Sequence, residues 1–290
     1  MIFFLRNLFL FLIISALCMV GCDDKITKDD IPSYLAIDTI ILSTNYGNQG
    51  TASNKITDAW VYVDNNLIGA FELPAKAIPI LAEGTHTITI SSGIKLNGIA
   101  STRARYAYYK NYTVKINLVR DSIIKIHPTT TYTDNTIFEW MEDFEDGSTS
   151  LERGSSSQTG LERISTDSLV FEGSNCGKAV LRDSSVFFEV KTISAFDLPL
   201  DDSPVYLELN YRNNIDFWIG FYANEISVTT QRSILKLNPT NEWKKIYFNL
   251  TPWINQFTSA KNFNIFFGFN RNYGDPEGII YLDNIKLVHR

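Results

Sequence analysis

Short runs in which apolar and polar residues alternate cover most of the chain after residue 32. In the run at 58–71, Trp60 and Tyr62 fall on one face and the alanine and valines beside them fall on the other, which is the two-residue period of a β-strand. Because Asn tolerates a positive φ, the Asp-Asn-Asn sequence at 64–66 predicts a tight turn that joins two strands. The pattern therefore predicts a β-hairpin early in the chain.

Alternating runs of the same kind recur to the C-terminus, separated by Asn, Asp, Gly or Pro, whereas helical 3.6-residue periodicity is hard to find after residue 22. Two prolines limit the segment 72–81 to an edge strand or a loop. We therefore predict an all-β protein with a small β-sandwich at 33–129, a Thr-rich segment at 130–137 that is a linker or an opening edge strand, and a β-jelly roll at 138–290. The other predicted strands lie at 85–92, 112–119, 205–214, 216–225, 233–239, 242–250, 262–271 and 278–290.

The first 21 residues have the pattern of a secretory signal peptide. Arg6 supplies a short positive region, and the apolar run at 8–20 is short for a membrane span and is followed by the small residue Gly21. The residues at 19–22 resemble a bacterial lipobox, and this resemblance implies cleavage before Cys22 and attachment of a lipid to that cysteine. The alternative is an uncleaved N-terminal anchor helix.

Residues 22–32 are charged and end at a proline, so we expect a solvated tether between the lipid and the first sandwich. The Asp-Asp-Lys sequence at 23–25 loosely resembles the acidic cluster that directs some lipoproteins to the outer face of the outer membrane. An ordinary soluble spacer explains the same composition. The segment therefore predicts a lipid-anchored protein of the cell outer membrane, and the export signal would place it on the cell surface.

The charge and the cysteine content narrow the class of protein. The formal net charge is −6, and removal of residues 1–21 takes away one more positive charge, so no basic surface for nucleic acid is expected. Of the three cysteines, Cys18 would leave with the signal and Cys22 would carry the lipid, so Cys176 has no partner for an intramolecular disulfide. The fold must therefore be stabilised by packing.

The sequence contains no constellation that points to catalysis. The histidines His86, His127 and His289 are scattered, which disfavours a His-based metal cluster and a Ser-His-Asp arrangement. No Gly-rich phosphate-binding loop is present. The acidic residues at 142–146 follow one strand, without the two-sided geometry of a glycosidase pair. We therefore expect a non-enzymatic protein.

The segment 33–129 resembles small surface β-sandwich modules of the PEGA type. An insertion at 93–112 replaces the usual continuation of such modules and contains a basic and aromatic patch, formed by Arg103, Arg105, Tyr106, Tyr108, Tyr109 and Tyr112. This patch is suited to stacking a sugar or meeting a partner protein, or its tyrosines close one end of the sandwich and its arginines are solvated. The residues that match the PEGA pattern are Val61, Val63, Asp64, Ile68, Gly69, Ile78, Gly84, His86, Ile88 and Ile90.

The segment 138–290 resembles carbohydrate-binding-module jelly rolls, also called galactose-binding-like domains. Four motifs carry the resemblance, at 143–147, 173–181, 242–250 and 281–287. The resemblance implies that the first and last strands are adjacent, and that a carboxylate from each holds a structural Ca²⁺, which maps onto Glu145 and Asp283. The alternative is that Asp283 and Asn284 form local hydrogen bonds at a strand.

In this family, aromatic side chains cover the apolar face of a sugar ring while amides bond its hydroxyls. The polar candidates are Asn210, Asn213 and Asn270, and Trp243 matches a structural tryptophan of the family. An aromatic stripe in a β-sandwich also serves as core, which is the alternative for each candidate. The aromatic ligand-binding candidates are Tyr206, Trp218 and Tyr222 on faces opposite apolar sets, with Tyr211, Trp253 and Tyr273 near strand ends.

Two hypotheses of different classes follow. The first is a non-catalytic, lipid-anchored envelope protein that binds glycan through its C-terminal jelly roll. The second is a structural or adaptor lipoprotein in an outer-membrane protein complex, which contacts its envelope partner through the sandwich end at 103–112.

Overall fold

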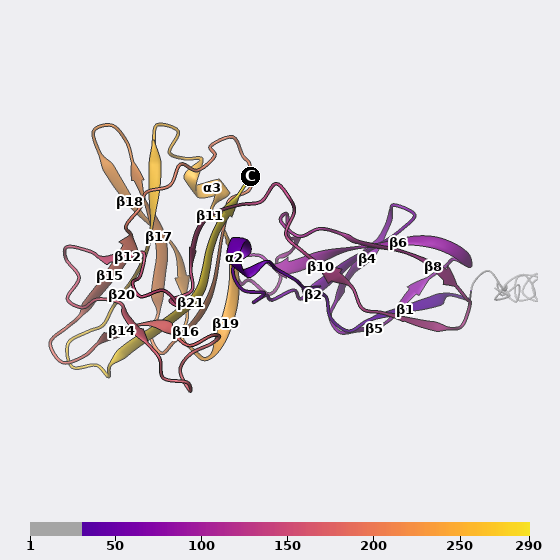
Figure 1. The fold of residues 1–290 in the computed structure, drawn as a ribbon, viewed down its shortest axis with the longest axis horizontal. Helices are drawn as coiled ribbons and strands as arrows, with labels where there is room; N and C mark the ends of the chain where they lie inside the picture. Colours follow the sequence, from indigo (N-terminus) through magenta and orange to yellow (C-terminus); the bar gives the residue numbers. More distant parts are fainter. Residues whose placement is uncertain (1–30) are drawn as a thin grey trace, which may run out of the picture.

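The computed structural model describes residues 31–290, and this part of the chain is almost entirely β-structure, which confirms the all-β prediction. The strands form two units that lie one after the other along the long axis of the molecule (Figure 1). We call the unit built from strands before residue 131 the N-terminal sandwich and the unit built from strands after residue 136 the C-terminal sandwich. The predicted signal peptide, Cys22 and most of the predicted tether lie outside the described residues.

The N-terminal sandwich contains ten strands and one short helix, α2 (Tyr46–Gln49). The strands are β1 (Ser33–Ile37), β2 (Ile41–Leu42), β3 (Asp58–Val63), β4 (Asn66–Glu72), β5 (Ala75–Ile80), β6 (Gly84–Lys95), β7 (Arg103–Arg105), β8 (Tyr112–Leu118), β9 (Ile123–Ile126) and β10 (Thr129–Thr130). A sheet of order β4-β3-β6-β7, with β8 also paired to β6, faces a sheet of order β5-β1-β9. Strand β5 is therefore an edge strand, as the prolines predicted.

The predicted hairpin is the β3–β4 pair. Asp64 and Asn65 have φ values of 47° and 68°, which is the geometry of the tight turn that short polar side chains tolerate. Val61 is fully buried, whereas Trp60 and Tyr62 are half-buried on the outer face. The similarity to PEGA modules stays a prediction.

The C-terminal sandwich packs a six-stranded sheet on a five-stranded sheet. Its strands are β11 (Ile137–Glu142), β12 (Leu151–Arg153), β13 (Glu162–Ile164), β14 (Cys176–Leu181), β15 (Phe187–Thr192), β16 (Tyr206–Asn213), β17 (Phe217–Asn224), β18 (Thr229–Leu237), β19 (Thr240–Asn249), β20 (Asn262–Asn270) and β21 (Gly278–His289), with helix α3 (Thr251–Ile254) after β19. The six-stranded sheet has the order β13-β14-β21-β16-β19, with β11 also on β21, and the five-stranded sheet has the order β12-β15-β20-β17-β18. The first and last strands, β11 and β21, are adjacent, as the resemblance to carbohydrate-binding-module jelly rolls implied.

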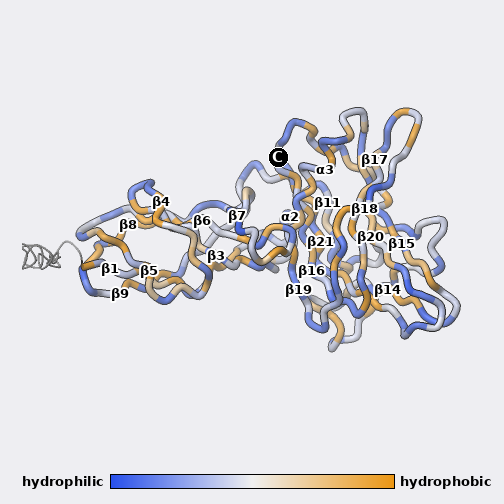
Figure 2. The backbone as a smooth tube through the Cα atoms, turned by 180° about the vertical axis from the view of Figure 1, so that it is seen from behind, coloured by the Kyte–Doolittle hydropathy of each residue, from blue (hydrophilic) through white to orange (hydrophobic). Residues whose placement is uncertain are grey.

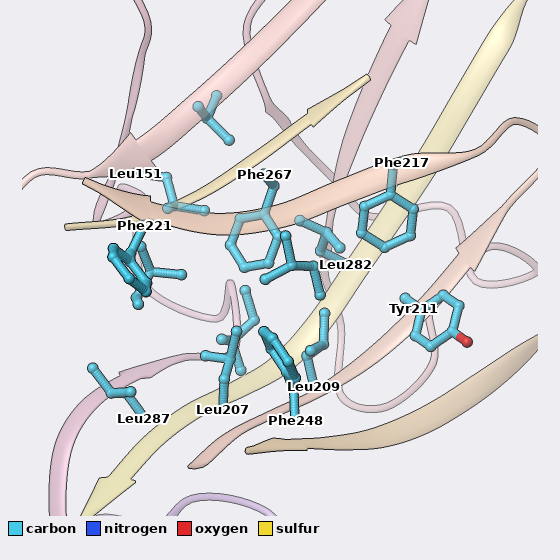
Figure 3. Close-up of a cluster of buried hydrophobic side chains, with 14 of the residues drawn as sticks. Leu151, Leu207, Leu209, Tyr211, Phe217, Phe221, Phe248, Phe267, Leu282 and Leu287 are labelled. Atoms are coloured by element: carbon cyan, nitrogen blue, oxygen red, sulfur yellow. The ribbon is translucent and has the colours of Figure 1, made fainter. Parts of the chain in front are cut away.

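Apolar side chains from both sheets fill the space between them. Leu207 and Leu209 of the six-stranded sheet face Phe217 and Phe267 of the five-stranded sheet, and all four are fully buried (Figure 3). Polar and apolar positions alternate along the strands of both sandwiches (Figure 2). The two-residue period in the sequence therefore sets which side chains enter the core.

The two sandwiches meet through a cluster of tyrosines, which we call the tyrosine interface. The Tyr106 ring packs edge-on to Tyr206 and tilted against Tyr247, with centroid separations of 5.1 and 4.8 Å. These rings are fully or nearly fully buried, so this interface resembles a small core rather than a wet contact. The residues of the tyrosine interface are Tyr106, Tyr108, Tyr109 and Tyr132 on the N-terminal side, with Tyr206 and Tyr247 on the C-terminal sandwich.

A buried carboxylate lies at the centre of the tyrosine interface. Tyr106 and Tyr132 donate hydrogen bonds of 2.6 and 2.9 Å to Glu208 Oε1, and Lys245 Nζ lies 3.2 Å from Glu208 Oε2. Burial, with the charge of Glu208 adding to it, raises the pKa of both tyrosines well above the usual range. The hydroxyls therefore remain protonated donors, and they hold the two sandwiches together.

This interface changes two expectations. Residues 130–137 are not a free linker, because Thr130 pairs with Leu42 and Tyr132 is buried in the tyrosine interface. Three tyrosines of the patch at 103–112, Tyr106, Tyr108 and Tyr109, pack on the C-terminal sandwich of the same chain and are not free for an envelope partner, whereas Tyr112 packs on the core of the N-terminal sandwich. The tyrosines therefore close the end of the N-terminal sandwich.

Candidate functional site

The outer face of the five-stranded sheet carries a polar cleft, which we call the binding face. The cleft has a volume of about 340 Å³ and is lined mostly by polar residues around one tyrosine, Tyr222. The sheet on which it lies is the one farther from the N-terminal sandwich (Figure 1). The side chains with polar groups that line the centre of the cleft are Glu189, Lys191, Tyr222, Asn224, Gln231 and Asn264.

Strand alternation and register bring these side chains together. Tyr222 on β17 lies opposite Asn264 on β20 and opposite Gln231 on β18. On β17 and β20 the residues beside Tyr222 and Asn264 point into the core, so Tyr222 and Asn264 face outward. The cleft is therefore built from side chains on rigid strands, which fixes their positions more firmly than loops would.

Glu189 organises the centre of the binding face. Its side chain accepts hydrogen bonds from the Tyr222 hydroxyl and, at 2.6 Å, from Gln231 Nε2. The Ser157 hydroxyl oxygen accepts the backbone N–H of Glu189 at 2.8 Å, which anchors the strand beneath. Burial, followed by the hydrogen bond to Glu189, raises the pKa of Tyr222 far above its usual value. The phenol therefore stays protonated and keeps the ring in place.

A row of amides flanks the tyrosine. Asn224 Nδ2 donates to Asn264 Oδ1 at 2.8 Å and to Asn262 Oδ1 at 2.9 Å. Asn264 in turn donates to the backbone oxygens of Thr192 and Ser194. These bonds fix the orientation of each amide, so the row presents polar atoms in defined directions.

The Tyr222 ring has an apolar neighbour and a cation beside it. Phe266 lies 5.4 Å away in a tilted arrangement, and Lys191 Nζ lies 5.9 Å from the ring centroid. Phe266 crosses Gly220, where an added Cβ would lie only 2.0 Å from the Arg232 carbonyl oxygen and 2.5 Å from the Phe266 ring. The glycine therefore allows the aromatic ring to approach the backbone of β17 closely.

The structure separates the six aromatic candidates. Trp218 lies on the same outer face as Tyr222, is 37% exposed, and has Lys236 Nζ at 5.7 Å from its ring. Trp253 is 40% exposed and lines a separate cavity of about 150 Å³ with Phe257. Tyr273 is 81% exposed on a loop, next to a cleft of about 750 Å³. Only Trp218 and Tyr222 therefore share a face.

Two aromatic candidates are wrong as exposed sugar platforms. Tyr206 does point away from the core of its sandwich, but the N-terminal sandwich covers it in the tyrosine interface. Tyr211 is buried inside the C-terminal sandwich, where it packs edge-on to Phe217 at 5.6 Å. The two sites fail for different reasons, because one is covered by another part of the chain and the other faces inward.

The asparagine candidates also lie apart from the cleft. Asn213 is buried and bonds the backbone oxygens of Ile215 and Asn238, so it is structural. Asn210 is on the six-stranded sheet, and Asn270 is exposed at the end of β20. The polar residues of the cleft were not among the candidates taken from the sequence. The alternation at 187–192 and 262–270 nevertheless places Glu189, Lys191 and Asn264 on outer faces, and this signal could have identified them.

The two carboxylates selected for calcium are engaged by N–H groups. Glu145 Oε1 accepts from the backbone N–H groups of Ser174 and Asn175, and its Oε2 accepts from the Asn175 amide. Asp283 accepts from the backbone N–H groups of Asn284 and Glu172. A cation would compete with these donors for the carboxylate oxygens, and residues 31–290 contain no group of three His, Cys, Asp or Glu placed to hold a metal ion. Calcium binding stays a prediction.

Comparison with known proteins gives similarity only at the level of solved structures. No family model and no curated protein matches the sequence. The chain is similar to the CBM22-1 xylan-binding domain of Paenibacillus barcinonensis Xyn10C, with 9% identity and a TM-score of 0.40, covering 52% of this chain and 94% of that one.

Two further structures are carbohydrate-binding modules. One, from a study of promiscuous specificity in the β-sandwich superfamily, has 12% identity and a TM-score of 0.40, covering 80% of this chain and 84% of that one. The other is the family 11 module of Clostridium thermocellum with a β-1,3-1,4-mixed-linked tetrasaccharide, at 13% identity and a TM-score of 0.36, covering 51% of this chain and 93% of that one. With identities and TM-scores this low, the ligand of this chain must be argued from its own side chains.

Proposed function

We propose that this protein is a non-catalytic glycan-binding protein and that the binding face holds the saccharide. The observation that supports the proposal is the cleft in which Tyr222 lies beside the bonded pair Glu189 and Gln231 and the row of amides. A sugar ring has an apolar C–H face that packs on an aromatic ring and hydroxyls that bond to amides and carboxylates. The binding face offers both kinds of contact within one cleft.

The polar groups of the cleft favour a neutral saccharide. The Glu189 carboxylate is negative and lines the cleft together with a single lysine, Lys191, which is itself 3.2 Å from Glu152. An acidic sugar at this position would meet that carboxylate, whereas a hydroxyl can donate to it. We therefore infer that hydroxyl groups of a neutral sugar contact Glu189 and the amide row.

The proposed location is the outer membrane, with a lipid on Cys22 as the anchor. Among residues 31–290, the structure has no helix that combines the length and hydrophobicity needed to cross a bilayer. Strand β1, which follows the predicted tether, belongs to the sandwich that does not carry the binding face (Figure 1). The N-terminal sandwich would then act as a spacer between the membrane and the glycan.

A glycan array with the full-length protein, followed by titration of the best ligand, tests the proposal. Tyr222→Ala removes the ring that covers the sugar, and we expect at least a tenfold loss of affinity. Tyr273→Ala is the matched control, because it removes an exposed tyrosine outside the cleft. Failure of any glycan to bind above background, or a loss caused by Tyr273→Ala and not by Tyr222→Ala, would contradict the proposal.

A further inference from the structure

A second concave site lies where the two sandwiches meet, around the edge strand β19 of the six-stranded sheet. We call it the inter-sandwich groove, and its volume is about 480 Å³. Lys55 and Lys95 from the N-terminal sandwich line it, together with Asn210, Trp243 and Lys244 from the C-terminal sandwich. The groove is complete only when the two sandwiches are docked, so neither sandwich would form it alone.

The groove carries an excess of positive charge. Four lysines and one glutamate, Glu242, contribute to its walls. Lys95 lies 3.4 Å from Asp58, and Lys245 lies 3.2 Å from Glu208, so these two charges are balanced. The ammonium groups of Lys55 and Lys244 have no ion pair or hydrogen bond with any residue in 31–290, so they remain available to an anion.

A buried amide in the groove wall lacks an acceptor. Asn210 is 1% exposed, and its Oδ1 accepts a 2.7 Å hydrogen bond from the Ser53 hydroxyl. Its Nδ2 donates to no atom of the described residues and is not fully withdrawn from solvent, so this donor is open to a ligand. Because Asn210 lines the groove, a bound acceptor oxygen would satisfy it.

An aromatic surface lies beside the lysines. Trp243 is half-buried and packs at 5.5 Å from Phe171, which is 39% exposed. Both rings line the groove. Aromatic surface next to cations and amide donors suits a ring-shaped ligand that has an apolar face, an anionic group and hydroxyls.

The walls of the groove are fixed before any ligand binds. The backbone N–H of Lys55 donates to the Tyr247 hydroxyl at 2.9 Å, and the backbone N–H of Asn97 donates to the Tyr247 backbone oxygen at 3.0 Å. The backbone N–H of Asn249 also donates to Asn97 Oδ1 at 2.8 Å. These bonds join the two sandwiches on the edge of the groove, so binding would cost little ordering of the chain.

We propose that the inter-sandwich groove is a second binding site and that it takes a saccharide residue bearing a carboxylate or a sulfate group. The sugar ring packs on Trp243, the anionic group lies against Lys55 and Lys244, and a ring hydroxyl or the anion accepts from Asn210 Nδ2. This site differs from the binding face in sheet, in charge and in ligand class. It does not depend on the proposed neutral-glycan site.

Titration of the full-length protein with three probes tests the proposal: an oligogalacturonide, which is carboxylated, a heparin-derived oligosaccharide, which is sulfated, and a neutral xylo-oligosaccharide. We expect binding of at least one acidic probe, with an affinity that falls as salt is added. The double substitution Lys55→Gln and Lys244→Gln should weaken that binding about tenfold or more. The acidic probe that binds identifies the source of the anionic group.

The matched control replaces two exposed lysines elsewhere, Lys115→Gln and Lys261→Gln, and therefore gives the same net charge. This control should retain the affinity of the unmodified protein, and so should Tyr222→Ala, which alters only the binding face. The proposal is overturned if neither acidic probe binds, if both double variants lose affinity equally, or if Tyr222→Ala removes the binding of the acidic probe.

Discussion

The Glu208 carboxylate and the Lys245 ammonium lie 3.2 Å apart, and both side chains are withdrawn from solvent where the two sandwiches meet. Burial lowers the pKa of Lys245, and the neighbouring Glu208 opposes this shift. Such a pair is costly to break from one side, because the remaining charge is left buried without a partner.

Glu208→Ala should lower the free energy of unfolding by about 3–5 kcal/mol, because it leaves Lys245 and the hydroxyls of Tyr106 and Tyr132 without their shared partner. Urea denaturation measures the change. The double variant Glu208→Ala with Lys245→Met should recover part of the loss, since it removes the unpaired charge. If Glu208→Ala costs less than about 1 kcal/mol, the pair is not the buried contact described above.

Asp283 should make stability depend on pH between about 4 and 7. Burial raises its pKa from 3.8 to about 7, with hydrogen bonds from Asn284 and Glu172 opposing and the charges of Glu172 and Glu145 adding. Because the pKa is raised on folding, the folded state favours the protonated Asp283 carboxyl. The resulting contribution of Asp283 to the free energy of unfolding is fully present below pH 4 and is lost as pH rises to 7. The loss approaches about 4 kcal/mol.

Urea denaturation of the unmodified protein and of Asp283→Asn across pH 4–8 isolates this contribution. The difference in free energy of unfolding between the two should change with pH in this window, because the amide does not ionise. A difference that is constant with pH would show that Asp283 is ionised throughout the range in the folded protein.

Calcium is expected to raise the melting temperature if it binds at Glu145 and Asp283. Calcium would bind only the folded state, and a calcium concentration about 100-fold above its dissociation constant adds roughly 2.7 kcal/mol to the free energy of unfolding. Thermal melts of the full chain with EDTA and with millimolar-scale calcium measure the effect, and Asp283→Asn should weaken it. If neither EDTA nor calcium changes the melting temperature, calcium does not bind here, and the N–H groups alone satisfy these carboxylates.

Cys22→Ser should release the protein from membranes or mislocalise it. Each buried CH₂ group of an acyl chain contributes about 0.8 kcal/mol, so loss of the lipid removes the proposed membrane affinity. Fractionation of cells that express each form measures the result. A variant that stays in the membrane fraction with its N-terminus cleaved would refute the lipid anchor.

Local patterns in the sequence were sufficient for most of the long strands, whereas β1, β9, β12, β13 and β15 were not predicted. The turn at Asp64 and Asn65 and the pairing of β11 with β21 were predicted, because alternation and turn chemistry act over a few residues and the jelly-roll resemblance supplied the topology. Tyr211 could also have been assigned to the core, since it follows Leu207 and Leu209 at intervals of two.

The two candidate binding sites depend on contacts between distant residues, which a local sequence pattern does not contain. Alternation along β16 correctly places Tyr206 on the outer face of its sheet. The sequence of that strand does not show that Tyr106 of the N-terminal sandwich covers it. Glu189 and Gln231 are 42 residues apart and become partners only through the sheet order. The inter-sandwich groove likewise requires the docking of two units, which the chain pattern leaves undetermined.

The tyrosine interface also has a mechanical consequence. A flexible linker would allow the two sandwiches to change their relative orientation. The buried rings and the shared carboxylate of the tyrosine interface oppose such motion. Tension on the glycan would then be transmitted through the junction to the N-terminal end instead of being absorbed by a hinge. If the protein holds a saccharide and is anchored at Cys22 as proposed, side-chain packing at this interface would fix the direction of the saccharide relative to the anchor.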